Sequence, residues 1–293
     1  MDLQLQYPKL QTITFSNQLL KLCHEARTTE NTKTLFDLSR TEFFTPFGII
    51  LLSGTIAECL AQKKLCTVRK PQKALTKKFL SGIGFNKFFK MKNGDQKIES
   101  RNVQLRRLNS IDYLFTDQIL EVFGDSLRMS EGVVGSLKMA LNELMTNAFD
   151  HSESERGCYV CAQSYPATKK IRLCIADFGV GILGSLRKIN KYNSLDSDNE
   201  AIMLAVQEGV TSRTDREGGY GLNHINRFIE VNEGKMHILS GNGKIFWNYS
   251  SNKKGKETKQ TVLYPFGGTV INLLMNADRE GFYFLKSDEG GIF

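Results

Sequence analysis

The sequence lacks an apolar run long enough to cross a bilayer. Its longest apolar stretch, residues 47–61, is interrupted by Ser53, Gly54, Thr55 and Glu58, whereas a membrane-spanning helix needs about 20 apolar residues. The first residues also lack the basic region and apolar core of a secretory signal. From these two absences we expect a cytoplasmic protein with no membrane among its partners.

The sequence also lacks a second pair of cysteines at metal-binding spacing. Cys158 and Cys161 form the only C-x-x-C motif among six cysteines. Residues three apart on a strand point to opposite faces of the sheet, so this pair is not arranged to hold one metal ion. We expect these cysteines to be buried thiols.

Positive charge is present but unevenly distributed. The chain has 293 residues, 41% hydrophobic and 24% charged, which is typical of a soluble globular protein with room for two domains. Its net charge is +8, yet residues 61–107 contain fourteen Lys or Arg against two acids, so they carry +12 and leave −4 for the rest. This segment is a candidate site for an acidic partner.

Phenylalanines are interleaved with these charges, at positions 79, 85, 88 and 89. Aromatic rings among basic residues can stack on nucleic acid. The plainer interpretation is a helix with a phenylalanine face in the core and a lysine face in water, and we favour it. Nucleic acid remains the less favoured partner for residues 61–107.

One helix carries the chemistry that stands out. Glu143, Asn147 and Asp150 are spaced i, i+4 and i+7, so they share one side of a helix. The residues of its opposite, apolar face are Leu137, Leu141, Leu144, Met145 and Ala148. Such a helix can offer oxygen ligands to a metal and a general base to a reacting group while its back is anchored.

Two glycine-rich segments follow this helix. An apolar strand, residues 171–176, runs into the segment 177–181, which reads Asp-Phe-Gly-Val-Gly, and the segment 216–221 ends in Gly219 and Gly221 just before a helix. The carboxylate at the strand end can accept from an amine, and glycine lets backbone approach a flat base or a phosphate. Amides at a helix N-terminus favour phosphate.

At these residues the chain resembles the GHKL superfamily of ATPases, which includes DNA gyrase, the ninety-kilodalton chaperones, mismatch-repair ATPases, sensor histidine kinases and anti-sigma serine kinases. The resemblance covers residues 112–278 and follows the family order of motifs. They are an N-box (Glu143, Asn147), a first glycine box (Asp177, Gly179, Gly181), a second glycine box (Gly219, Gly221) and a closing strand with Gly268 and Thr269. It implies an α+β fold of the Bergerat type, an ATP-binding α/β sandwich with a mixed sheet.

The resemblance also implies a role for each residue. Asn147 would hold Mg²⁺ against the phosphates, Glu143 would act as the base, and Asp177 would accept from the adenine amino group with Thr269 beside it. Residues 190–217 would form a lid over the phosphates. The implied ATP contacts are Asn147, Asp150, Asp177, Gly179, Gly181, Thr211, Ser212, Arg213, Gly219, Tyr220, Gly221 and Thr269.

Other interpretations of these segments stay open. Glu143 and Asn147 could belong to the solvated side of an ordinary helix, and the glycines to ordinary turns. The segment 179–184 also matches the G-x-G-x-x-G pattern of dinucleotide-binding proteins. Against that pattern, Asp177 would put a carboxylate beside a pyrophosphate, so we do not favour it.

The N-terminal part predicts alternating strands and helices, which is typical of a small α/β domain. The expected strands are 11–15, 34–39 and 65–69, and the expected helices 16–26, 46–62 and 73–90. Residues 36–52 and 79–89 resemble a STAS domain, the fold of anti-anti-sigma factors, but Thr45 and Pro46 stand where that family has its phosphorylatable serine. We expect a STAS-like domain over 1–95, a basic connector over 96–111, the GHKL domain over 112–278 and a tail over 279–293.

Late in the chain, residues 235–240 and 244–249 predict a hairpin about Gly241 and Gly243, and residues 269–274 predict a central strand. His24 lies in a segment that superficially matches the phosphoacceptor box of histidine kinases, although that box belongs on a long helical hairpin. We favour a slow ATPase or an ATP-dependent switch with a protein partner or a second copy. A serine/threonine kinase and a module that only binds ATP are the alternatives.

Overall fold

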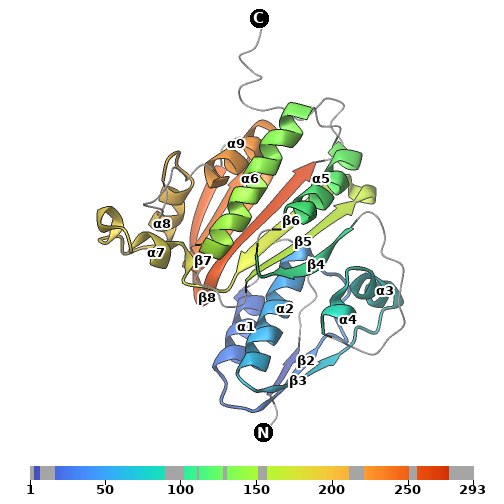
Figure 1. Cartoon of the computed structure of the whole chain (residues 1–293). Helices are drawn as coiled ribbons and strands as arrows, with labels where there is room; N and C mark the ends of the chain where they lie inside the picture. Colours follow the sequence, from blue (N-terminus) through green and yellow to red (C-terminus); the bar gives the residue numbers. More distant parts are fainter. Residues whose placement is uncertain are drawn as a thin grey trace, which may run out of the picture.

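The structure, a computed structural model, describes residues 3–6, 17–89, 102–110, 112–127, 131–150, 157–210, 221–250 and 256–276. These residues form two sheets, with helices packed against them (Figure 1). No helix among these residues has both the length and the apolar character required to span a membrane.

The smaller sheet is parallel. Its strands are β1 (Leu3–Gln6), β2 (Lys33–Asp37) and β3 (Leu65–Arg69), in the order β1-β2-β3. The crossover helices are α1 (Asn17–Thr28) and α2 (Pro46–Ala61). Because both crossovers advance in the same direction and crossovers are right-handed, the two helices lie on one face of the sheet. Two short helices, α3 (Ala74–Gly82) and α4 (Phe85–Phe88), complete this part.

Helix α2 is apolar around its whole circumference, and every residue from 46 to 56 is buried. Thr45 caps its start, since the Thr45 hydroxyl accepts from Gly48 N at 3.2 Å, and Pro46 takes the first helical position. A helix that is hydrophobic on all sides must be enclosed by other elements. The sequence of α2 therefore requires a second layer besides the three-stranded sheet.

The larger sheet supplies that layer. Its strands are β4 (Asn102–Leu108), β5 (Cys158–Tyr165), β6 (Lys170–Asp177), β7 (Lys235–Asn248) and β8 (Lys256–Asn276), in the order β4-β5-β6-β8-β7. All of these pairings are antiparallel. Strand β7 doubles back on itself, because Tyr249 N donates to Gly234 O at 3.0 Å and the rings of His237 and Phe246 lie 4.1 Å apart.

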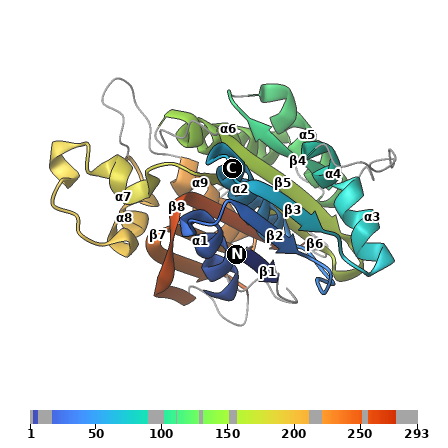
Figure 2. The ribbon, with the colours of Figure 1, turned by 90° about the horizontal axis from the view of Figure 1, so that it is seen from below.

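The two faces of this sheet are covered by different parts of the chain. Alternate residues of β6 show this directly: Leu173 and Ile175 belong to one hydrophobic cluster, and Cys174 and Ala176 belong to another. The first cluster includes residues of α5 (Tyr113–Leu127), α6 (Glu131–Asp150) and α9 (Gly221–Val231). The second includes residues of α1 and α2 and of the smaller sheet. Helices α1 and α2 thus lie between the two sheets (Figure 2).

The structure confirms the expected α+β class, since parallel and antiparallel pairing occur in separate sheets. The expected mixed C-terminal sheet is wrong for the described strands, which pair only antiparallel. Strands β5 and β6 form a hairpin, and β8 lies between β6 and β7, antiparallel to both. Part of the segment expected as a connector is strand β4, whose partner β5 lies some 50 residues later. A pairing of that range leaves no local sequence signal.

Most local expectations are confirmed. Helices α1, α2 and α6, strands β2 and β3, the hairpin within β7 and the central position of β8 all appear where the patterns predict them. Strand β1 was not predicted, and the expected strand 11–15 lies outside the described residues.

Candidate functional site

Asp177 is the last residue of β6 and is 6% exposed. Its carboxylate accepts from Gly179 N at 3.0 Å and from the amide and hydroxyl of Thr269. Burial outweighs these hydrogen bonds and raises the pKa of Asp177 to about 7. The described groups that act on this carboxylate are hydrogen-bond donors, and none of them carries a charge. Asp177 is therefore a buried acid without a counter-ion among the described residues.

The turn after Asp177 is fixed by Ser240, a fully buried residue of β7. The Ser240 hydroxyl accepts from Ile182 N at 2.8 Å and donates to Gly268 O at 3.1 Å, and it lies 3.3 Å from Thr269 Oγ1. One side chain thus ties β7 and β8 to the start of α7 (Gly181–Leu186).

Two glycines allow this close approach. Gly268 has φ +114°, and a Cβ there would overlap the Asp177 carbonyl oxygen and lie 2.8 Å from Gly179 N. Gly181 has φ +72°, and a Cβ there would lie 2.8 Å from Ser240 Oγ. Only glycine adopts these conformations readily and leaves this space. The first glycine box and the closing strand, which are about 90 residues apart in sequence, meet at one place.

The N-box helix lies over the same face of the sheet. The predicted apolar face of α6 is buried at Leu137, Leu141, Leu144, Met145 and Ala148, as expected. Glu143 and Asn147, on its other side, are half-buried. Gly221 opens α9 and touches this helix, since a Cβ on Gly221 would lie 2.8 Å from the Cβ of Glu143.

Strand alternation puts the remaining parts on that face as well. Asp177 has the same parity in β6 as Leu173 and Ile175, which pack under α6 and α9. Thr269 lies two residues before Ile271 in β8, and Ser240 lies two residues after Ile238 in β7. Each therefore points to the same face as that isoleucine, which belongs to the same cluster. Glu143, Gly221, Asp177 and Thr269 therefore belong to the face of the five-stranded sheet that α5, α6 and α9 cover.

Several predicted site residues lie outside the described part of the chain. They are Thr211, Ser212, Arg213, Gly219 and Tyr220. Asp150 ends α6, but its side chain is not among those described. The predicted phosphate contacts of the lid therefore stay predictions.

The alternative dinucleotide site is wrong. A G-x-G-x-x-G site needs a strand in a parallel βαβ unit, whereas β6 is antiparallel to both of its neighbours, β5 and β8. The segment 179–184 belongs instead to the turn around Gly181 and the short helix α7.

The other residues singled out in the sequence have structural surroundings. Cys158 and Cys161 belong to clusters on opposite faces of β5, and both are buried, as expected. Burial raises the pKa of each thiol. His24 lies on the 12-residue helix α1, 5.7 Å from the ring of Tyr264, and not on a long hairpin. Thr45 is 4% exposed and serves as the α2 cap.

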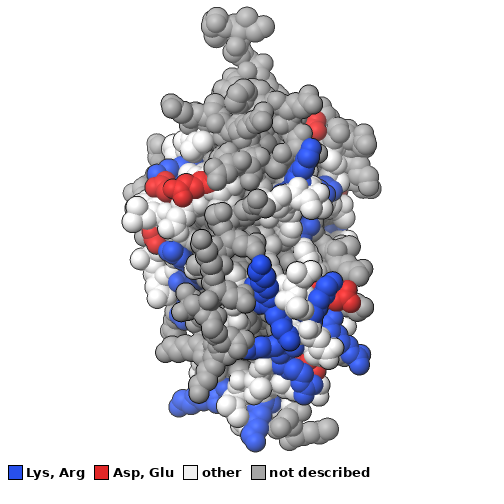
Figure 3. Space-filling view, turned by 90° about the vertical axis from the view of Figure 1, so that its right-hand side faces the viewer, with Lys and Arg blue, Asp and Glu red and all other residues white. Residues whose placement is uncertain are grey.

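The phenylalanines of the basic segment face inward, as the favoured interpretation predicts. Phe85 is 1% exposed, and Phe79, Phe88 and Phe89 pack against the core. The lysines at positions 73, 77 and 78 are exposed along α3. Basic side chains outnumber acidic ones over the lower half of this side of the molecule (Figure 3). The rings needed to stack on a nucleic acid are thus used in the core.

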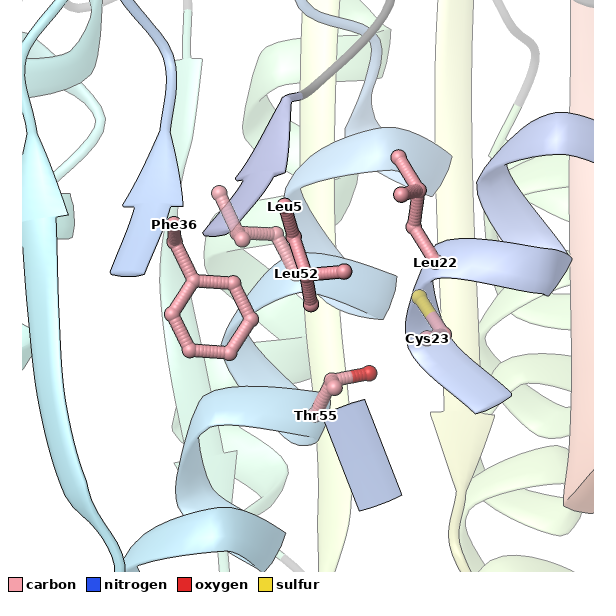
Figure 4. A pocket seen from close by; sticks show the side chains of 6 residues that line it. All are labelled: Leu5, Leu22, Cys23, Phe36, Leu52 and Thr55. Carbon is pink, nitrogen blue, oxygen red and sulfur yellow. The ribbon is translucent and has the colours of Figure 1, made fainter. Parts of the chain in front are cut away.

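A narrow apolar crevice lies elsewhere, between α1, α2 and the smaller sheet (Figure 4). Its lining residues are Leu5, Leu22, Cys23, Phe36, Leu52 and Thr55. It is too tight to hold a water molecule. We assign it to imperfect packing of the core and not to a ligand.

Ser240 is the residue of the site that sequence reasoning missed. It shares the parity of Met236 and Ile238, whose side chains point into the core. A small polar residue at the third such position, just before Gly241, is a signal that it bonds to backbone.

No family model matches this sequence, and no curated protein matches it. The GHKL resemblance therefore stays an expectation from the sequence motifs.

Proposed function

We propose that this protein binds ATP with Mg²⁺ in a GHKL-type site on the face of the five-stranded sheet that α5, α6 and α9 cover. The observation that carries the proposal is Asp177, a buried carboxylate with no charged partner among the described residues and with glycines at close quarters. Uncompensated titratable groups cluster at functional sites. An adenine amino group is a donor that would satisfy this carboxylate.

The residues present fit the nucleotide. Gly181 and Gly268 let the segment after Asp177 pack directly against the start of the last part of β8, because a side chain at either position would overlap backbone or Ser240. This packing fixes the turn that presents the Asp177 carboxylate. Glu143 and Asn147 are half-buried on α6, and an amide oxygen such as that of Asn147 is a ligand that Mg²⁺ accepts. The start of α9 at Gly221 touches Glu143, which supports a phosphate position between the two helices.

Bound Mg-ATP would supply the transferable phosphoryl group. Asp177 would accept the hydrogen bond that selects adenine, and Asn147 would hold the Mg²⁺ ion. Glu143 takes the proton from an attacking water or hydroxyl, which is the general-base role that phosphoryl transfer requires. The chain thus provides positioning and proton transfer, and needs no covalent intermediate of its own.

We propose slow hydrolysis or an ATP-dependent switch, acting through the N-terminal layer, which consists of the smaller sheet and the helices α1 to α4, or through a protein partner. The N-terminal layer is STAS-like in our proposal, but the switch serine is absent and the adjacent Thr45 is used as a helix cap. A buried capping hydroxyl is poorly placed for phosphorylation, which favours a binding role for this layer. A serine/threonine kinase of the anti-sigma type is the second candidate, because Glu143 in the N-box is shared with that branch.

The test is calorimetric titration of the full chain with Mg-ATP, followed by assays for released phosphate and for labelled protein. We expect the wild type to bind, and Glu143→Ala to bind equally well while losing turnover. Glu230→Ala, an exposed carboxylate on α9, is the matched control and should keep both. Absence of binding in the wild type contradicts the proposal.

The same assays separate the candidates. Phosphate release without labelled protein supports an ATPase. Label on a serine or threonine of a partner supports the kinase. Binding with neither product supports the module that only binds ATP, and label on His24 supports a histidine kinase.

A further inference from the structure

Two consecutive residues at the end of β6 point to opposite faces of the sheet. Asp177 faces the cluster under α6 and α9, whereas Phe178 belongs to the cluster formed by α1, α2 and the smaller sheet. Phe178 is 7% exposed and lies between two other rings, with centroids 5.2 Å from Tyr159 and 5.2 Å from Phe266. The turn that carries the candidate adenine acceptor therefore places one side chain in the cluster between the five-stranded sheet and the helices α1 and α2.

The seat of Phe178 is a glycine in the middle of α2. A Cβ on Gly54 would overlap the far end of the Phe178 ring, at Cζ and both Cε atoms. Glycine in a helix interior costs about 1 kcal/mol relative to alanine. The enclosed helix α2 bears that cost at the one position where the ring meets its backbone.

A second contact links α1 to the start of the segment 265–269, which lies against the Asp177 turn. Arg27 donates from Nη2 to Pro265 O at 3.1 Å, and its Nη1 lies 3.5 Å from Glu58 Oε2. Pro265 begins the segment that runs through Gly268, whose backbone touches Asp177 and Gly179, to Thr269. The two segments that would surround the base, 177–181 and 265–269, are thus each contacted by a helix of the N-terminal layer.

We propose that Phe178, seated on Gly54, is a positioning residue that couples the nucleotide pocket to α2, so that the N-terminal layer sets the affinity for ATP. This inference rests on the proposed function and adds its regulation. Movement of α2 displaces the ring of Phe178, and Phe178 directly follows Asp177 in the chain. By reciprocity, a nucleotide that fixes the Asp177 turn also stabilises the contact between Phe178 and α2.

The test adds a methyl group at Gly54 and then removes the ring atoms that it overlaps. If the contact between Gly54 and Phe178 only stabilises the fold, neither change should alter the affinity for ATP. In the full chain at pH 8, Gly54→Ala should raise the dissociation constant for Mg-ATP by about tenfold. Phe178→Leu removes the ring atoms that overlap the new methyl group. The double variant Gly54→Ala with Phe178→Leu should therefore return the dissociation constant toward the wild-type value.

Gly82→Ala is the matched control, because a Cβ on this buried helical glycine of α3 would meet nothing within 4 Å. It should leave the affinity unchanged. A folded Gly54→Ala variant that binds ATP as the wild type does, or a double variant that shows no recovery, overturns the inference. Should Gly54→Ala fail to fold, Phe178→Leu alone decides: weaker binding in a cooperatively melting protein supports the coupling, and unchanged binding overturns it.

The proposed function and this inference fail differently. A wild-type chain that binds no ATP overturns both. Wild-type binding of ATP with no effect of either substitution leaves the proposed function intact and overturns the coupling alone.

Discussion

Two strands of this protein end in a buried aspartate, and the two carboxylates have opposite surroundings. Asp37 ends β2 and Asp177 ends β6, and each accepts from the amide two residues on, at 2.9 Å from Ser39 N and 3.0 Å from Gly179 N. Asp37 also meets Arg69 Nη1 at 2.8 Å and Gln4 Nε2 at 3.1 Å. Asp177 has only uncharged donors among the described residues.

The pKa values separate the two. Hydrogen bonds from Ser39, together with the Arg69 charge, lower the pKa of Asp37 below its ordinary value. Burial raises the pKa of Asp177 to about 7. The contribution of Asp37 to stability is present at neutral pH and is lost as the pH falls through its depressed pKa. Asp177 acts in the opposite sense, because folding disfavours its ionised form.

The comparison separates an acid whose charge the fold compensates from one whose charge it does not compensate. Asp37 is compensated within the fold, so nothing further is needed to hold its charge. Asp177 is ionised only at a cost, and a ligand that donates to it would recover part of that cost. Position at a strand end and burial alone do not tell these two roles apart.

The largest expected effect is that of Asp177→Asn. Because the ionised carboxylate is disfavoured in the folded state, this substitution should raise the free energy of unfolding at pH 8 by on the order of 2 to 4 kcal/mol. It should also abolish ATP binding. Denaturant unfolding and calorimetry measure the two effects. A variant that is less stable than the wild type at pH 8 would show that Asp177 is compensated like Asp37.

Asp37→Asn should act in the other direction. The loss of charge-assisted hydrogen bonds to a buried carboxylate should lower the free energy of unfolding by roughly 2 to 3 kcal/mol at pH 7. ATP affinity should stay the same, since no residue of the candidate site contacts Asp37 among the contacts described. A large loss of affinity in a folded variant would break the division between the two acids.

Ser240→Ala tests the framework around Asp177. Removal of the hydroxyl leaves Ile182 N and Gly268 O without their buried partner, which should cost about 2 kcal/mol of stability. It should also weaken ATP binding, because both groups flank the pocket. Ser164→Ala, a half-buried serine of β5, is the control, and an equal loss of affinity in both variants would argue against a specific role for Ser240.

The smallest expected effect is a pH dependence of ATP affinity. If the ionised form of Asp177 is the acceptor, the affinity should rise by about tenfold between pH 6 and pH 8, as the competent fraction grows. Calorimetry across this range measures it. The titration of Asp37, whose pKa is lowered, should cause no change of ATP affinity between pH 6 and pH 8. An affinity that does not vary over this range would show that ionisation of Asp177 does not control binding.

Local patterns in the sequence predicted a large part of the fold. The apolar face of α6, the start of α9 at Gly221 and the hairpin within β7 follow from periodicity and turn residues, which act over a few positions. Asp177, Gly181 and Gly268 were likewise identified by their motifs. Patterns of this kind are visible because the residues that specify them are neighbours in the chain.

The rest depends on contacts between distant residues. The pairing of β4 with β5, the role of Ser240 and the seat of Phe178 on Gly54 each join segments about 50 residues or more apart. The sequence showed that α2 is apolar throughout, but not that a second sheet would cover it. Asp37 shows the same limit, because its compensation comes from Gln4 and Arg69, on the two neighbouring strands.

The most direct test of the central claim compares two nucleotides whose bases differ only at C6 and at the proton on N1. Inosine triphosphate has the same phosphates as ATP but a carbonyl oxygen in place of the exocyclic amine. In calorimetric titrations of the wild type with Mg²⁺ at pH 8, we expect ATP to bind and the inosine nucleotide to bind at least about 100-fold more weakly, because its oxygen would face the Asp177 carboxylate. Equal binding of the two, or binding of neither, would contradict the account.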